Sequence, residues 1–320
     1  MSKKNNQSND PSIIRSGMLN VGDGHQIYWE DWGNPDSFPA IHFHGGPGGG
    51  TSESHKLVFN PEKHRVVFFD QRGSGKSTPF AETKNNTTQK LIEDTNKLRK
   101  HLDIEKMYLI GGSWGSTMTL AYALAHPEQV EAMVSWGIYL AQQFENDFIS
   151  NGYARYTYPE AWERFIALVP KDHRKDGNSI TKYYSEKLHS SDQIEAITYA
   201  DEWSLWENSL TTVKYDKREM EQYSIGAEKN LALARLETHY FLNGCFMPKN
   251  YILDNLEKIK HIPFYVVQGR FDNCTPPITA YQLSKAYGNN MTLQMVNAGH
   301  SRSDPELRTA LRSVINAIFV

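Results

Sequence analysis

The sequence contains little of what several protein classes require. It has only two cysteines in 320 residues, Cys245 and Cys274, which is too few for a disulfide framework and typical of a protein with reduced thiols. Its formal net charge is −3, so no overall basic field attracts nucleic acid. No stretch approaches the roughly 18 uncharged apolar residues that a membrane span needs. These absences predict a cytoplasmic protein with neither a nucleic acid nor a membrane as partner.

The amino terminus differs in composition from the rest of the chain. Residues 1–12 are polar and lack the apolar core of a secretory signal, so we expect a disordered tail. The remaining length is enough for one large catalytic domain or for two ordinary ones.

Strand-like and helix-like segments alternate in the first and last parts of the chain. Apolar, β-branched runs predict strands at 25–32, 39–43, 65–69, 107–110, 130–136, 263–268 and 291–296. Helical spacing of apolar residues predicts helices at 88–101, 113–125, 277–287 and 305–318. This alternation predicts an α/β fold with a mostly parallel sheet, right-handed crossovers and flanking helices.

The middle of the chain has a different pattern. From about residue 141 to 250 it is helical in spacing, polar and rich in Tyr and Trp, and no strand-like run interrupts it. The simplest interpretation is a sheet domain formed by residues 1–140 plus 251–320. A helical insertion, residues 141–250, then lies between the two parts.

One short segment has the pattern of a nucleophile elbow. Residues 111–115 have the sequence Gly-Gly-Ser-Trp-Gly and lie between the predicted strand 107–110 and a helix, where the G-x-S-x-G elbow belongs. Glycines allow the sharp turn, and the helix N-terminus places partial positive charge beside Ser113. The alternative is a Gly-Ser turn in which Ser113 only caps the helix.

A serine hydroxyl needs a base and an orienting acid to become a useful nucleophile. His300 follows the predicted strand 291–296, and Asp272 follows the strand 263–268. Taken singly, His300 could be an ordinary loop histidine and Asp272 a helix cap. The chain order Ser, Asp, His is that of α/β-hydrolases, so position and order together predict the triad Ser113, Asp272 and His300.

An acyl-transfer site also needs backbone N–H groups that face the tetrahedral intermediate. One is expected from Trp114, the residue after the nucleophile. The other is expected from the loop after strand 39–43, which has the sequence His-Gly-Gly-Pro-Gly at 44–48. Gly46 is the predicted donor and Gly45 is the alternative.

Two further patterns do not predict a cofactor site. Residues 73–77 end like a phosphate-binding loop, but Asp70 occupies the position where that motif requires its first glycine. His42 and His44 form a His-x-His pair at the corner between a strand and the glycine loop. No Glu or Cys cluster completes a metal site there, which favours a structural role.

Taken together, these motifs resemble the prolyl aminopeptidases (proline iminopeptidases), a family of serine peptidases with the α/β-hydrolase fold. The resemblance begins near residue 13 and covers nearly the whole chain. It rests on the segments 44–48, 70–77, 111–117, 121–123, 126–127, 203–207, 237–241, 269–272 and 299–301.

The resemblance implies an enzyme that releases N-terminal proline from peptides through an acyl-enzyme, without metal or cofactor. It also implies an inserted helical cap whose glutamates bind the free imino group of the substrate, at positions that match Glu207 and Glu237. The family commonly has a cysteine three residues after the triad aspartate. Here Thr275 stands at that position and Cys274 comes one residue earlier, so no role is carried over to Cys274.

Physical chemistry agrees with the implied role of the glutamates, because carboxylates in a partly desolvated site suit a cationic terminus. On pattern alone, however, Glu207 and Glu237 would be ordinary solvated helix residues. The competing interpretation is an aminopeptidase of broader specificity, or an esterase, on the same scaffold. Ser113 disfavours a dehalogenase or an epoxide hydrolase, and the complete triad disfavours a receptor without catalytic activity.

Overall fold

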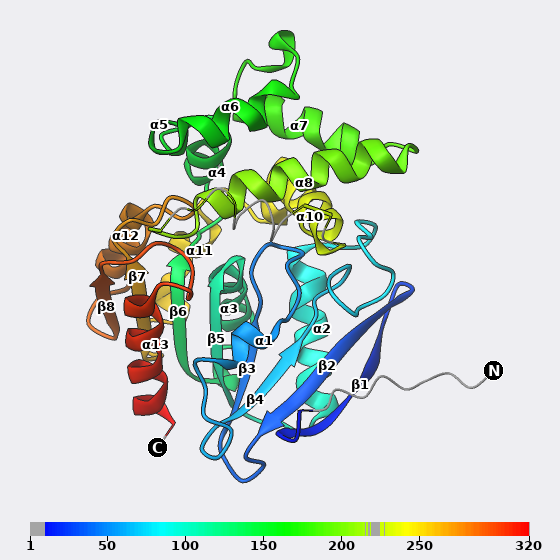
Figure 1. Ribbon diagram of the computed structural model, residues 1–320. Helices are drawn as coiled ribbons and strands as arrows, with labels where there is room; N and C mark the ends of the chain where they lie inside the picture. The colour runs from blue at the N-terminus through cyan, green and yellow to red at the C-terminus, as the bar shows by residue number, and fades with distance from the viewer. Residues whose placement is uncertain (1–9, 215, 217, 219–224, 227, 320) are drawn as a thin grey trace, which may run out of the picture.

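A single eight-stranded sheet forms the centre of the computed structural model, which describes residues 10–214, 216, 218, 225–226 and 228–319 (Figure 1). The strand order is β1-β2-β4-β3-β5-β6-β7-β8. The β1/β2 and β2/β4 pairs are antiparallel and the other pairs are parallel. The predicted mostly parallel sheet is therefore confirmed. The strands are β1 (Ile13–Gly22), β2 (His25–Gly33), β3 (Pro39–Phe43), β4 (Arg65–Phe69), β5 (Met107–Ser113), β6 (Val130–Ile138), β7 (Phe264–Gly269) and β8 (Met291–Val296).

Helices cover both faces of the sheet, and among the described residues none is long and apolar enough to cross a membrane. The helices outside the middle of the chain are α1 (Glu53–Lys56), α2 (Thr88–His101), α3 (Trp114–Ala125), α11 (Tyr251–Asp254), α12 (Pro277–Tyr287) and α13 (Pro305–Ile318). Short 3-10 turns lie at η1 (Pro127–Gln129), η3 (Gly244–Phe246) and η4 (Leu256–Lys258).

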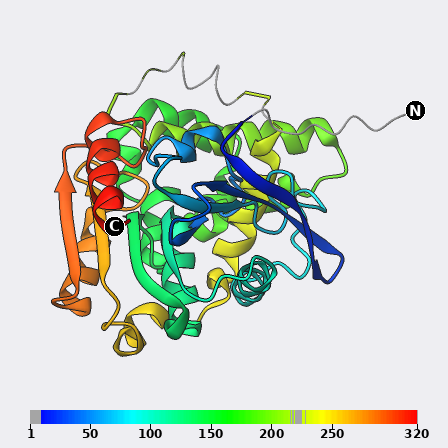
Figure 2. The same cartoon turned by 90° about the horizontal axis from the view of Figure 1, so that it is seen from below.

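Two apolar cores lie on the two faces of the sheet. Alternate residues of β3 divide between them: Ile41 and Phe43 pack with α2, α3 and α12, whereas Ala40 packs with α13. Figure 2 shows α13 on one side of the sheet and α2 and α3 on the other. Because both faces are covered, the central strands are mostly apolar, as expected of a buried parallel sheet.

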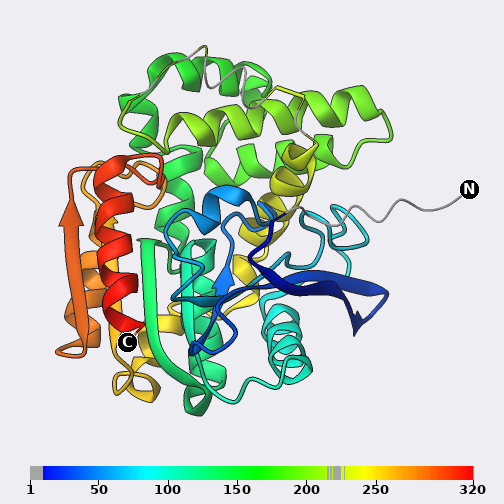
Figure 3. The same ribbon diagram turned by 60° about the horizontal axis from the view of Figure 1, so that its bottom comes forward.

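The described part of residues 143–242, between β6 and β7, consists of helices joined by turns and contains no strand. These helices gather above the carboxyl ends of the central parallel strands (Figures 1 and 3) and have an apolar cluster of their own. They are α4 (Gln143–Ser150), α5 (Ala154–Thr157), α6 (Pro159–Ala167), η2 (Lys171–His173), α7 (Gly177–Leu188), α8 (Gln193–Ser209) and α10 (Lys229–Leu242).

The structure differs from the sequence prediction at the amino terminus. Strand β1 was not predicted, because it lies at the edge of the sheet and Val21 is its only buried residue. Residues 10–12 are not a disordered tail: the Asp10 carboxylate accepts hydrogen bonds from Trp32 Nε1 and Lys56 Nζ, both at 2.9 Å. The rest of the expected tail, residues 1–9, lies outside the described residues.

Candidate active site

Ser113 lies at the sharp turn between β5 and α3. Its backbone has φ 59° and ψ −129°, a strained conformation for a residue with a side chain. The turn is tight because its neighbours are glycines: a Cβ atom on Gly111 would lie 2.4 Å from the Gly115 carbonyl oxygen. A Cβ atom on Gly112 would lie 2.0 Å from the Trp136 ring. The geometry is that of a nucleophile elbow, which exposes the serine hydroxyl at the end of a strand.

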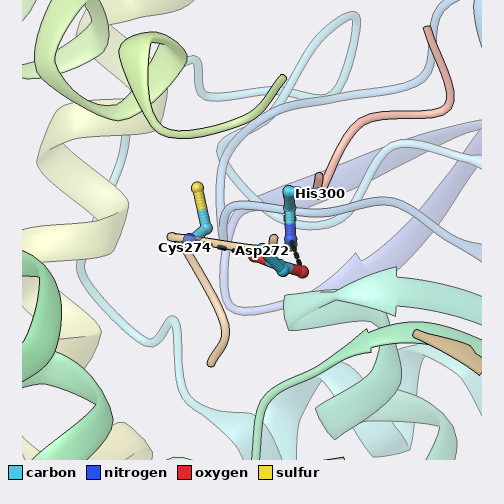
Figure 4. Close-up of side chains that lie close together, drawn as sticks. All are labelled: Asp272, Cys274 and His300. Atoms are coloured by element: carbon cyan, nitrogen blue, oxygen red, sulfur yellow. Dashed lines mark hydrogen bonds and ion pairs between the residues drawn. The ribbon is translucent and has the colours of Figure 1, made fainter. Parts of the chain in front are cut away.

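Asp272 and His300 meet at the same end of the sheet. Asp272 follows β7, His300 follows β8, and His300 Nδ1 lies 2.8 Å from Asp272 Oδ2 (Figure 4). His300 also lines a cavity of about 620 Å³ together with Ser113. The structure thus brings Asp272 and His300 into direct contact and places Ser113 and His300 on the wall of the same cavity.

The protonation of His300 is set by two opposing effects. Burial alone would lower its pKa, but the adjacent Asp272 carboxylate outweighs burial and holds the pKa of His300 above its ordinary value. Because the Asp272 contact occupies Nδ1, the other ring nitrogen, Nε2, is the atom left for proton exchange. Such an imidazole can accept a proton from a hydroxyl and is stabilised when it becomes charged.

The Asp272 carboxylate is held by donors that the motif analysis missed. Oδ1 accepts the backbone N–H groups of Cys274 and Thr275, at 2.9 and 2.8 Å. Oδ2 accepts the Thr275 hydroxyl at 2.9 Å and Gln268 Nε2 at 3.1 Å, in addition to His300. Thr275 Oγ1 also lies 3.2 Å from His300 Nδ1. Thr275 therefore contacts both members of the pair from the position where the family commonly has cysteine.

Asp272, Cys274 and His300 also form a group whose potential metal-ligand atoms lie within 4.8 Å of one another. The geometry does not fit a metal site well. A metal needs a thiolate, whereas burial raises the pKa of the Cys274 thiol well above its ordinary value. The Asp272 oxygens are already occupied by five donors, and in Figure 4 the thiol points away from the Asp272–His300 contact. We therefore interpret the group as an acid–base pair with a neutral buried thiol beside it.

The glycine loop after β3 passes directly beside the nucleophile. A Cβ atom on Gly45 would lie 3.4 Å from Ser113 Cβ. The Gly45 carbonyl oxygen accepts hydrogen bonds from Gly49 N at 3.2 Å and from His44 Nδ1 at 2.8 Å. These contacts fix the peptide plane that also carries the N–H of Gly46. The expected donor, Gly46, therefore belongs to a peptide group with a defined orientation next to Ser113, and Gly45 is the residue nearer to the serine.

His44 connects this loop to the Asp-Gln-Arg-Gly segment. Its Nε2 accepts the backbone N–H of Gln71 at 3.0 Å, so its proton lies on Nδ1, which donates to the loop. Burial lowers the pKa of His44, which keeps the ring neutral. Gln71 also donates to the His44 carbonyl oxygen and accepts Trp114 Nε1, at 3.1 and 2.9 Å. Gln71 thus links the two expected oxyanion donors, Gly46 and Trp114, a role that no single motif indicated.

The phosphate-loop-like segment at 73–77 has a structural explanation. The Asp70 carboxylate accepts the backbone N–H groups of Thr51 and Lys76, at 2.6 and 2.8 Å. The fully buried Arg72 forms ion pairs with Asp94 at 2.5 Å and with Asp23 at 3.1 Å. These contacts tie the segment to α2 and to the β1–β2 turn.

Glu207, which is half-buried, and Glu237, which is buried, form a carboxyl pair on two neighbouring helices, α8 and α10. Glu237 is only 1% exposed, and its Oε2 accepts Trp203 Nε1 at 2.5 Å. Its Oε1 is buried without a hydrogen-bond partner among the described residues. Burial, reinforced by the Glu207 carboxylate, raises the pKa of Glu237 well above its ordinary value. Burial also raises the pKa of Glu207.

The carboxyl pair lies close to the histidine. Glu207 and His300 influence each other electrostatically, and the Cys274 thiol lies 3.8 Å from the Glu207 carbonyl oxygen. The backbone N–H groups of His300 and Ser301 both donate to Thr211 O, at 2.8 and 2.7 Å. The end of α8 thus contacts the histidine loop directly. The solvated-helix alternative does not describe Glu237, because its side chain is removed from water.

Comparisons with known proteins agree with this geometry. The family model described as alpha/beta hydrolase fold matches residues 41–304. The chain is 43% identical to a proline iminopeptidase of Arabidopsis thaliana over 92% of its own length and 77% of that protein. It is 42% identical to a proline iminopeptidase of Neisseria meningitidis over 96% of each chain.

Solved structures with lower sequence identity share the fold. A proline iminopeptidase-related protein from Thermus thermophilus superposes with a TM-score of 0.63 at 19% identity, over 95% of this chain and 98% of that one. A proline iminopeptidase of Mycobacterium smegmatis gives a TM-score of 0.56 at 17% identity, over 95% and 97%. Fold, family model and full-length relatives agree, and the chain therefore belongs to the proline iminopeptidase family of α/β-hydrolases.

Proposed function

We propose that this protein is a serine aminopeptidase that releases N-terminal proline from peptides. The observation that carries the proposal is the carboxyl pair, Glu207 and Glu237, beside the Asp272–His300 pair. A serine site alone would fit any acyl transfer. Carboxyl groups withdrawn from water next to that site select a substrate that brings a positive charge close to the scissile bond.

The chemistry proceeds in two acyl-transfer steps. Ser113 Oγ attacks the prolyl carbonyl carbon while His300 Nε2 accepts the hydroxyl proton. The oxyanion is stabilised by the N–H groups of Trp114 and Gly46. Collapse of the intermediate breaks the C–N bond, and His300 returns the proton to the leaving amine. The ester on Ser113 is then hydrolysed by a water that His300 deprotonates, which releases proline and restores the serine.

Recognition of the substrate terminus follows from the carboxyl pair. The secondary amine of an N-terminal proline is cationic at neutral pH and carries two N–H donors, whereas Glu237 Oε1 is an acceptor without a partner among the described residues. Binding would satisfy that acceptor and offset the burial and the repulsion from Glu207 that together raise the pKa of Glu237. An internal proline has neither the charge nor the N–H, so cleavage is restricted to the chain end.

The division of labour follows the two parts of the structure. We assign residues 1–140 plus 251–320 to the α/β-hydrolase catalytic domain and residues 141–250 to a helical cap that recognises the substrate. The hydrolase part supplies Ser113, Asp272 and His300, and the cap supplies Glu207 and Glu237. The expected cytoplasmic location is part of the same proposal, and peptides with a free N-terminal proline are the expected substrates.

The test is release of proline from Pro-Xaa peptides, with the N-acetylated peptides as a matched control. The proposal expects rapid release from the free peptides and no measurable release from the acetylated ones, with the Ser113→Ala variant inactive on both. Equal turnover of free and acetylated peptides would contradict the role of the carboxyl pair. It would instead favour an aminopeptidase of broader specificity or an esterase on the same scaffold.

A further inference from the structure

The cavity beside Ser113 and His300 has a charge opposite to that of the carboxyl pair. The described residues that line it include two arginines, Arg302 and Arg308, and none of them is acidic. The active site therefore has acidic groups on one side and basic groups on the other. Carboxyl groups lie on the side of α8 and α10, and guanidinium groups lie on the side of the loop that follows His300.

Arg302 is held close to the nucleophile by an aromatic contact. Its guanidinium lies 4.9 Å from the centre of the Trp136 ring. The same ring packs so tightly on Gly112 that a Cβ atom there would lie 2.0 Å from it. Because Gly112 immediately precedes Ser113, this stack places the cation near the reacting bond. The electrostatic effect of Arg302 on His300 agrees with that placement.

No anion among the described residues neutralises Arg302. Its Nη1 is buried without a hydrogen-bond partner, and burial lowers its pKa to about 10. The nearby His42 and His55 are neutral, because burial keeps their pKa values well below the ordinary value, and a neutral imidazole cannot balance the charge of Arg302. Asp304, two residues along the chain, accepts Gly299 N at 2.6 Å and the Thr212 hydroxyl at 3.0 Å. A half-buried cation with a buried, unpaired Nη1 and no counter-charge is costly, so the site is suited to an anion from outside the chain.

The position of the cavity indicates which part of a substrate carries that anion. In the proposed function, Glu207 and Glu237 hold the imino nitrogen, so the acyl part of the substrate is a single proline. Everything after the scissile bond must leave on the other side of Ser113. The cavity-lining residues 301–303 directly follow His300, which protonates the leaving amine. The leaving residue therefore faces Arg302.

We propose that Arg302 binds a carboxylate on the residue that follows the N-terminal proline. This inference rests on the proposed function and adds the chemical class of the leaving group. Two sources offer the same chemistry. One is the free α-carboxylate of a Pro-Xaa dipeptide, and the other is an acidic side chain in a longer peptide. In either case an Arg–carboxylate contact contributes specificity through charge-assisted hydrogen bonds.

The experiment compares kcat/KM for two pairs of substrates that differ only in one negative charge. Pro-Gly and Pro-Gly amide test the α-carboxylate, and Pro-Glu amide and Pro-Gln amide test an acidic side chain. In wild type, at least one charged substrate should exceed its neutral partner on the order of tenfold. The pair that shows the preference identifies the source of the carboxylate.

Variants locate the effect. Arg302→Gln should bring the charged-to-neutral ratio close to one, whereas Arg302→Lys, which keeps the charge, should retain part of the preference. Arg312→Gln is the matched control, because Arg312 is an exposed arginine of α13 outside this cavity, and its ratio should equal that of wild type. Each ratio is measured within one variant, so a partial loss of folded protein cancels.

The outcomes separate this inference from the function on which it rests. Release of proline from both members of both pairs at equal rates in wild type would overturn the carboxylate site and leave the aminopeptidase standing. Retention of the preference in Arg302→Gln would also overturn it. Release of proline from none of the four substrates would overturn both proposals.

Discussion

Asp272 and Glu237 are buried to a similar extent, but their hydrogen-bond environments are opposite. Asp272, on the sheet side, accepts five hydrogen bonds, two from backbone N–H groups and three from side chains. Glu237, on the helical side, accepts one from Trp203, keeps Oε1 unpaired among the described residues and faces a second carboxyl group, Glu207. The oxygens of Asp272 all have hydrogen-bond donors within the protein, whereas one oxygen of Glu237 has none among the described residues.

This difference separates a catalytic charge from a recognition charge. A charge that must stabilise a transition state is most effective when its surroundings are already oriented. A charge that must select a ligand is most effective when the unbound protein leaves it unsatisfied, because binding then gains what the protein lacks. Asp272 fits the first description and Glu237 fits the second. The predictions below test whether the two carboxylates act on different stages of the reaction.

The largest effect is expected from removal of the triad. Ser113→Ala, Asp272→Ala and His300→Ala should each reduce kcat by roughly 10⁴- to 10⁶-fold on every substrate, since the three residues act as a unit. For the same reason a double variant should lose little more than a single one. Steady-state kinetics on folded protein, checked by circular dichroism, is the measurement. A folded Ser113→Ala variant with near-normal kcat would contradict the assignment.

The next effect concerns only substrates with a free terminus. Glu237→Gln and Glu207→Gln keep the side-chain size but remove the charge, so kcat/KM for Pro-Xaa peptides should fall on the order of 10²- to 10³-fold. Hydrolysis of a small neutral ester should change far less. Glu163→Gln, at an exposed position of α6, is the matched control and should behave as wild type. An equal loss on peptide and ester would show that the pair is structural.

The pH dependence of kcat should report the Asp272–His300 pair. His300 must be neutral to act as base, so kcat falls as the pH drops through its pKa. Because Asp272 holds that pKa above the ordinary value, the acidic limb should lie above about 6.5. In Asp272→Asn the residual activity should have its acidic limb at lower pH, since the carboxylate is gone. An unmoved limb would mean that His300 is not the titrating base.

A smaller effect is expected from Thr275, which contacts both Asp272 and His300. Thr275→Val keeps the shape but removes the hydroxyl, so kcat should fall about tenfold with little change in KM, because the group orients the pair without contacting substrate. Thr275→Ser should restore most of the activity. If the serine variant were as impaired as the valine variant, the methyl group rather than the hydroxyl would be the important part.

The sequence predicts the frame of the molecule better than its supporting contacts. Strands such as 39–43 and 65–69 are mostly apolar, and the helices 88–101 and 277–287 have regular spacing, so their bounds agree with the structure. Strand β1 escaped prediction because it is an exposed edge that buries almost nothing. The apolar runs and periodic spacing that predict an element arise only where that element is buried.

The same distinction holds at the site. Asp272 and His300 are predictable because each follows a strand of a parallel sheet, and such ends meet in space. Gln71, Thr275 and Arg302 are not, because their roles depend on side-chain contacts with residues distant in the chain. Thr275 had one signal, its position three residues after Asp272. Burial of Glu237 was implied only by the family resemblance, since a helical glutamate is usually exposed.

The most direct test of the two-carboxylate account is the rate at which Ser113 reacts with a small neutral phosphonate. This reagent needs an activated serine and has no cationic group, so its rate reports Ser113, Asp272 and His300 and not the carboxyl pair of α8 and α10. The account predicts that Glu237→Gln is labelled at nearly the wild-type rate while Asp272→Asn is labelled orders of magnitude more slowly. Equal slowing of both variants would contradict it, because the two carboxylates would then support a single function.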